Sequence, residues 1–153
     1  SDISGLIGQY AHGNEPSHHI VHLYNYVNQS WKAQQLIDTI LHTQYFNNPN
    51  GLSGNEDCGQ MSAWYVLNAM GFYQVCPGSP IYSVGRPIFD KVTINLPNGK
   101  VFEIIANNNS RTNKYIQSIR LDNILLESPF FMHSDIMKGG KIVMEMGNTP
   151  VKQ

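Results

Sequence analysis

The spacing of the apolar residues changes at Gly71, and this change limits the folds that the chain can adopt. Before Gly71, apolar side chains recur at three- and four-residue intervals, which predicts helices over residues 16–28, 31–45 and 59–70. Gly71 itself is expected to cap the end of the third helix. Strands should dominate beyond residue 80, because apolar and polar residues alternate there.

The expected fold class is α+β, since helices come first and strands follow them. We expect a helical segment over residues 1–73 and an antiparallel β region over residues 74–153. The Asn98-Gly99 pair predicts a tight hairpin within that β region. The third helix is apolar on nearly every side, so we expect it to be buried all round.

Composition excludes some classes of partner. The chain has 153 residues and a net charge of -1, with 14% charged residues. Without a basic face, nucleic acid is not an expected partner. No apolar run reaches the roughly 18 residues that a membrane helix needs. Two cysteines do not form a disulfide framework, and the many uncharged polar residues suit sugar binding.

Acidic side chains precede two of the predicted helices. One group is Asn14-Glu15, and the other is Asn55-Glu56-Asp57. If the second helix runs in the opposite direction to the first and third, those two helices begin at the same end of the molecule. The carboxylates of Glu15, Glu56 and Asp57 could then converge there. Convergent carboxylates fit sugar hydrolysis or calcium binding. The alternative is that the two groups are unrelated helix caps, with Asn55 or Asp57 capping the third helix.

The histidines do not favour zinc. His18 and His22 are four residues apart on one face of a predicted helix. The metalloprotease pattern places Glu directly after its first His, whereas His19 is followed by Ile20 here. No cysteine cluster supports zinc either. We expect a polar contact from His18 or His19 near the acidic group, and packing or partial exposure for His22.

Several runs of sequence carry a resemblance to a known family: Gly13 to His19, Gly54 to Tyr65, Leu67 to Tyr73, Cys76 to Pro80, and Phe89 to Lys91. They closely resemble glycoside hydrolase family 92, the calcium-dependent, inverting exo-α-mannosidases. The resemblance extends from about Gly13 to Gly147. Family members have an N-terminal β-sandwich and a catalytic (α/α)6 barrel. The resemblance therefore implies that this chain is the C-terminal end, with the last barrel helices and the strands that follow.

The resemblance also implies roles for single residues. Asp57 matches the carboxylate proposed as general base, with Glu56 as a helper. Asn55 stands where many members carry a second acid. It is an expected substrate contact, as is Asn14, which stands where some α-1,2-specific members have His.

Glu15 matches a glutamate near the substrate sugar and the calcium. It is therefore expected to contact the substrate and to ligate the calcium. The stretch around His18 resembles one that helps to hold calcium. The expected metal ligands are therefore Glu15, His18 and Asp57, and calcium is the expected cofactor.

The implied function is removal of terminal α-linked mannose from glycans by a secreted or periplasmic enzyme. The general acid of the family lies upstream of the residues present, so we expect the isolated chain to be inactive. Two alternatives stay open at this stage. One is a non-catalytic module that binds calcium or carbohydrate, and the other is a structural fragment that self-associates through exposed apolar surface.

Overall fold

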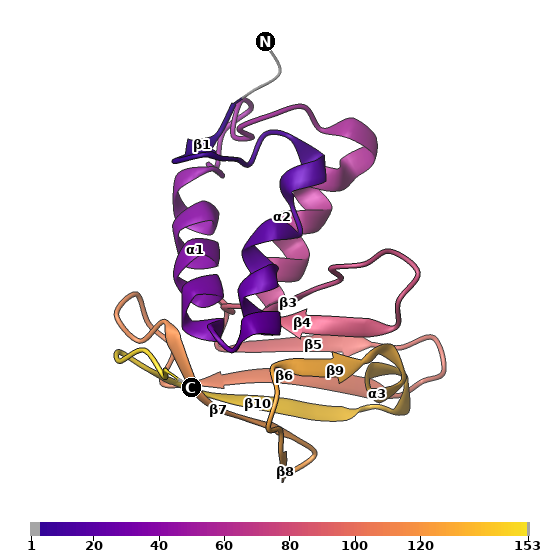
Figure 1. The fold of residues 1–153 in the computed structure, drawn as a ribbon. Coiled ribbons are helices and arrows are strands. Elements are labelled where there is room, and N and C mark those ends of the chain that lie inside the picture. Colours follow the sequence, from indigo (N-terminus) through magenta and orange to yellow (C-terminus); the bar gives the residue numbers. More distant parts are fainter. Residues whose placement is uncertain (1–3, 153) are drawn as a thin grey trace.

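The computed structural model describes residues 4–152. A layer of helices stands on one side of two β-sheets (Figure 1). The elements, with η marking a 3-10 helix, follow in this order: β1 (Leu6–Ile7), β2 (Tyr10–Ala11), η1 (Glu15–Ser17), η2 (Ile20–Val27), α1 (Ser30–Thr43), η3 (Asp57–Gly59), α2 (Gln60–Met70), β3 (Phe72–Tyr73), β4 (Ile81–Val84), β5 (Lys91–Asn95), β6 (Val101–Asn107), β7 (Tyr115–Leu121), β8 (Ile124–Leu125), β9 (Phe130–Met132), α3 (His133–Lys138) and β10 (Gly140–Gly147).

The predicted helix over 16–28 is helical in the structure, but it consists of two 3-10 segments, η1 and η2, and not of one continuous helix. In a 3-10 helix, side chains three residues apart lie directly above one another. His22 and Asn25 are such a pair, and both are buried with hydrogen bonds to the hydroxyl of Ser83, at 3.2 and 2.6 Å. The tighter helix therefore lets two polar side chains share one partner.

The other two helices begin within one residue of their predicted starts and end within two of their predicted ends. Gly71 ends α2 in a left-handed conformation, φ 107°, and its N–H donates to the carbonyls of Leu67 and Asn68. The expectation that this helix is buried all round is wrong. Trp64 is fully buried, but Val66 is 52% exposed, because the described residues cover only one face of α2.

The fold class α+β is confirmed. Within residues 4–152, one sheet has the strand order β5-β6-β10-β7-β8 and another has the order β3-β4-β9. All pairs in them are antiparallel except β6 and β10, which run parallel with Ile104 opposite Ile142. The larger sheet is therefore mixed, because β10 enters it beside β6 after the α3 crossing. The hairpin at Asn98-Gly99 joins β5 to β6 as predicted.

Buried polar contacts fasten the helices to the larger sheet. Asp38 of α1 pairs with Arg86 at 3.0 Å and with Lys114 at 3.5 Å, and Asp38 and Arg86 are both at least 95% buried. Gln34, one turn earlier, accepts the backbone N–H of Ile116 in β7 at 3.0 Å. Removing one member of such a buried ion pair typically costs about 3–5 kcal/mol. These contacts hold the two layers in a fixed orientation.

The division of the chain at residue 73 into two domains stays a prediction.

Candidate active site

Two helices begin at the end of the molecule that is remote from the sheets. Figure 1 shows η2 and α2 running side by side in the same direction, with α1 running back between them in sequence. Contacts support this arrangement, since Gln60 at the start of α2 hydrogen-bonds the ring of His18, just before η2, at 3.0 Å. The ends that carry the two acidic groups therefore lie together, as the sequence predicted.

Asp57 opens η3 and is exposed. Its carboxylate makes no hydrogen bond and no ion pair with any residue between 4 and 152. Cys58 and Gly59, which follow it, are both left-handed, with φ of 53° and 76°. A left-handed residue other than glycine is strained, and such strain concentrates at functional sites. The backbone thus turns sharply after Asp57 and leaves its carboxylate exposed to solvent.

Glu56 has a different environment. One carboxylate oxygen accepts the backbone N–H of Ser62 at 3.1 Å, and the other accepts the Ser62 hydroxyl. Ser62 is the third residue of α2, so Glu56 satisfies a free N–H at the helix start. The expectation that Asn55 or Asp57 caps this helix is therefore wrong. The Ser62 hydroxyl and backbone bonds also hold the pKa of the Glu56 carboxyl below its usual value.

A hollow of about 400 Å³ lies beside this end, lined by Glu15, His18, Gln60, Tyr73 and their neighbours. One carboxylate oxygen of Glu15 is buried and has no hydrogen-bond partner among the described residues. Buried polar atoms are nearly always paired, so an unpaired carboxylate oxygen indicates a missing donor or cation. The backbone N–H of Gln60 donates to the backbone carbonyl of Asp57. Asp57 therefore lies one helical turn before Gln60, which lines the hollow.

Histidine contacts stiffen that wall. His18 Nε2 donates to the carbonyl of His12 at 3.0 Å, and its Nδ1 accepts from Gln60 at 3.0 Å. Gln60 also donates to the hydroxyl of Tyr73 at 3.0 Å. Burial lowers the pKa of His18, so the ring is neutral. Its ring nitrogens are both engaged, and its side chain therefore does not fit the role of a metal ligand.

His12 anchors the same network from behind. It is fully buried, with Tyr10 at 2.8 Å from Nδ1 and Tyr45 at 2.6 Å from Nε2. Burial, aided by the neighbouring His18, lowers the pKa of His12 to about 3. The sequence analysis missed His12, Gln60 and both tyrosines. Tyr45 lies 33 residues from His12, and no local pattern connects residues so far apart.

The expected calcium ligands fit only in part. Glu15 offers a buried oxygen without a partner, and Asp57 offers an exposed carboxylate. Across the residues that the structure describes, no three His, Cys, Asp or Glu side chains group together as a metal site requires. Asn14 and Asn55 are exposed at the same end of the molecule. No helix in the described part of the chain is both long and apolar enough to span a bilayer.

Comparisons with known proteins identify the class of protein. The catalytic domain of glycosyl hydrolase family 92 matches residues 1–148. The structure is similar to the family GH92 alpha-mannosidase BT3965 from Bacteroides thetaiotaomicron in complex with mannoimidazole, with TM-score 0.93 and 44% identity over 98% of this chain. It is also similar to the family GH92 inverting mannosidase BT2199 from Bacteroides thetaiotaomicron, with TM-score 0.87 and 42% identity over 94% of this chain.

An uncharacterized secreted glycosidase of Arthroderma benhamiae is 27% identical over 138 residues, 88% of this chain. The chain is thus a glycoside hydrolase sequence. More specifically, it belongs to glycosyl hydrolase family 92, as the sequence predicted. It spans only 20%, 19% and 18% of the lengths of these three proteins.

Proposed function

We propose that this chain is the C-terminal part of an inverting exo-α-mannosidase that removes terminal α-linked mannose from glycans. Family membership and the similarity to two mannosidases support the substrate class. The observation that carries the proposal is the free Asp57 carboxylate next to a hollow with an unpaired Glu15 oxygen. The family match does not favour the alternative of a non-catalytic module or a structural fragment.

Asp57 is the general base in this proposal. An inverting glycosidase needs a carboxylate that deprotonates water on the face of the sugar opposite the leaving group. Asp57 has the required properties, since its carboxylate is exposed to water and is not used by other side chains. The general acid belongs to a part of the enzyme outside these residues, at the separation of roughly 6.5–9.5 Å that inversion requires.

Glu56 supports the base without reacting. Its carboxylate accepts hydrogen bonds from Ser62, the third residue of α2. These bonds attach the loop that carries Asp57 to the start of α2. A base that is held in one position loses less entropy when the transition state forms. The proposed role of Glu56 as helper is therefore one of positioning.

Glu15 and the two exposed amides of Asn14 and Asn55 bind the sugar in this proposal. The unpaired oxygen of Glu15 can accept a sugar hydroxyl or ligate a cation. Calcium, when bound, would polarise sugar hydroxyls and stabilise charge in the transition state. Glu15 and Asp57 would hold it, together with ligands from the rest of the enzyme.

The neutral network of His18, Gln60 and Tyr73 keeps the hollow wall rigid. The Gln60 amide nitrogen donates to both His18 and Tyr73, and these two hydrogen bonds orient the amide beside Glu15. We also propose a secreted or periplasmic location, by analogy with the relative named as a secreted glycosidase.

The stereochemistry of the first product tests this function. The complete enzyme should release β-mannose first from an aryl α-mannoside, because a single displacement inverts the anomeric carbon. Proton NMR spectra taken in the first minutes distinguish the two anomers before mutarotation. Initial release of α-mannose, or no turnover by the complete folded protein, would contradict the proposal.

A further inference from the structure

One helix of the helical layer is apolar on the face that it turns to solvent. Every exposed residue of η2 is hydrophobic or aromatic, and each is between 42% and 59% exposed: Ile20, Leu23, Tyr26 and Val27. The opposite face of η2 is buried, and its sequence contains no Asp, Glu, Lys or Arg. A helix without a charged face is typical of one that is covered on all sides.

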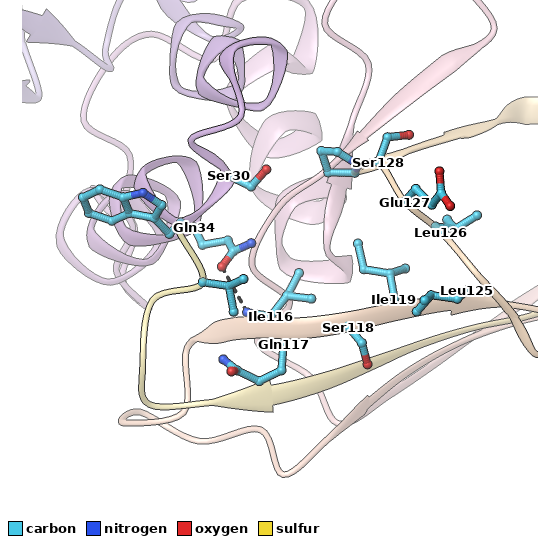
Figure 2. A pocket seen from close by; sticks show the side chains of 13 residues that line it. Ser30, Gln34, Ile116, Gln117, Ser118, Ile119, Leu125, Leu126, Glu127 and Ser128 are labelled. Atoms are coloured by element: carbon cyan, nitrogen blue, oxygen red, sulfur yellow. Dashed lines mark hydrogen bonds between the residues drawn. The ribbon is translucent and has the colours of Figure 1, made fainter. Parts of the chain in front are cut away.

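The neighbouring helix α1 has the opposite character. Its exposed residues, Gln35, His42 and Thr43, are all polar. Its buried face is already occupied, because Gln34 accepts the backbone N–H of Ile116 in β7 at 3.0 Å (Figure 2). The helix α1 is therefore suited to face solvent. In contrast, η2, the dark violet helix at the front of the helical layer in Figure 1, keeps an apolar face that residues 4–152 leave exposed.

The exposed apolar side chains of η2 form a straight row, here named the η2 ridge. Residues three apart in a 3-10 helix lie directly above one another, so Ile20, Leu23 and Tyr26 follow one line over about 12 Å. Tyr26 extends this line to the sheets, since the centroid of its ring lies 4.7 Å from that of Phe130 in β9. The other end of the ridge begins directly after His19, which lines the hollow beside Glu15. The η2 ridge therefore runs from the candidate active site toward the sheets.

The candidate active site still needs one catalytic group. In the proposed function, an inverting mechanism requires a carboxylic acid roughly 6.5–9.5 Å from the base Asp57. Among the described residues that line the hollow, Glu15 is the only acidic one, and we assign it to ligand binding. The chain spans only 20% and 19% of the two mannosidases, so the proposed enzyme has further segments that can supply the acid. Such a group must be held firmly, because a misplacement of about 1 Å can lower the rate about 10²-fold.

We propose that the η2 ridge is the docking surface for a helix of the complete protein outside residues 1–153, and that this helix holds the general acid opposite Asp57. The identity of the docked group as the acid rests on the proposed function. A straight row of apolar side chains fits the groove between the side-chain rows of a neighbouring helix. During hydrolysis, water attacks the anomeric carbon and gives a proton to Asp57, while the glycosidic C–O bond breaks and the acid gives its proton to the leaving oxygen. The η2 ridge thus sets the distance between acid and base across the hollow.

The experiment compares two substrates in the complete protein that carries this chain. An α-linked mannobiose has a sugar leaving group that needs a proton from the acid, whereas 2,4-dinitrophenyl α-D-mannopyranoside releases a phenolate that departs without one. Leu23→Ala shortens the middle of the η2 ridge without adding a charge, and Leu23→Val takes its place if that variant does not fold. Gln35→Ala is the matched control, because it truncates an exposed side chain of α1.

We expect Leu23→Ala to lower kcat/KM about tenfold for the mannobiose and less than about twofold for the dinitrophenyl mannoside, with both values unchanged in Gln35→Ala. A crystal structure of the complete protein should show the helix that bears the acid against Leu23. Equal losses on the two substrates, or no loss on either, would overturn the inference. A crystal structure in which the η2 ridge faces solvent or a second copy of the protein would overturn it as well.

Failure of the proposed function is distinguishable from failure of the docking. If the complete protein hydrolyses neither mannoside, the proposed function fails, and the melting temperature still tests whether a helix covers the η2 ridge. Leu23→Ala should lower the melting temperature, because truncating a covered leucine leaves a cavity, whereas Gln35→Ala should not. The same melting temperature in both variants would show that nothing docks on the η2 ridge.

Discussion

Three buried imidazoles should make this fold sensitive to mild acid. His12 and His22 are fully buried, and burial lowers their pKa from 6.5 to about 3 and about 4. Burial also lowers the pKa of His18. The same imidazoles titrate near 6.5 in the unfolded chain. Between these values the unfolded state binds more protons than the folded state, so the free energy of unfolding rises with pH.

The size of the effect follows from these pKa values. The stabilisation is complete above pH 6.5 and is lost as the pH falls through 6.5 toward 4. Each such imidazole costs about 1.4 kcal/mol for every pH unit below 6.5, or about 2 kcal/mol at pH 5. His12 and His22 together therefore remove about 4 kcal/mol at pH 5. This is a large part of the roughly 5–15 kcal/mol that stabilises a typical domain.

Urea unfolding between pH 5 and pH 8, followed by the fluorescence of buried Trp64, measures the effect. His22→Gln keeps an amide near Asn68 and Ser83 but takes up no proton, so it should reduce the slope by about 1.4 kcal/mol per pH unit near pH 5. His133→Gln, at an exposed position, is the control and should leave the slope unchanged. Stability that does not vary between pH 5 and pH 8, or an unchanged slope in His22→Gln, would refute the reasoning.

Other predictions concern the proposed enzyme. Asp57→Asn in the complete protein should lower kcat about 10²–10⁴-fold in a mannoside assay with little change in KM, and normal kcat in a folded variant would assign the base elsewhere. Glu56→Gln should lower the melting temperature in a thermal melt, and its kcat should fall less than that of Asp57→Asn, because Glu56 caps α2 and does not react. A chelator should abolish activity of the complete enzyme and calcium should restore it, whereas restoration by zinc alone would contradict the ligand chemistry. The isolated 153-residue chain should hydrolyse no α-mannoside and should elute as an oligomer in size exclusion, because apolar side chains such as Phe46 and Val66 are 57% and 52% exposed.

Short sequence patterns correctly predicted the helix end and the hairpin turn, because neighbouring residues alone determine these two features. Gly71 ends α2 because a glycine adopts the left-handed conformation without strain, and the Asn98-Gly99 turn joins β5 to β6 for a similar reason. Spacing alone could not distinguish the 3-10 helix η2 from an α-helix. The tighter helix brings both polar side chains to Ser83, which lies 61 residues from His22; the Ser83 hydroxyl accepts from Asn25 and donates to His22 Nδ1. The parallel pairing of β6 with β10 depends equally on a distant segment.

The candidate site shows the same limit. The sequence predicted that the acidic groups gather at one end, because a short connection joins the first two helices and makes them antiparallel neighbours. The polar network behind them could not be predicted, since a hydrogen bond such as that between His12 and Tyr45 leaves no periodic signal. The exposure of Val66 was also missed, because residue type predicts burial only when the neighbouring surface is known.

The two Gly-Asn-Glu sequences have different structural roles, and this difference supports the roles that we propose for their carboxylates. Glu56 precedes a long α-helix with free N–H groups, and its carboxylate binds Ser62. Glu15 is the first residue of a 3-10 segment of only three residues, and the next residue, Pro16, has no N–H to donate. Its oxygen is therefore left unpaired beside the hollow. In the proposed site, Glu56 therefore holds the loop, Glu15 is the carboxylate that binds a ligand, and Asp57 is the one that accepts a proton.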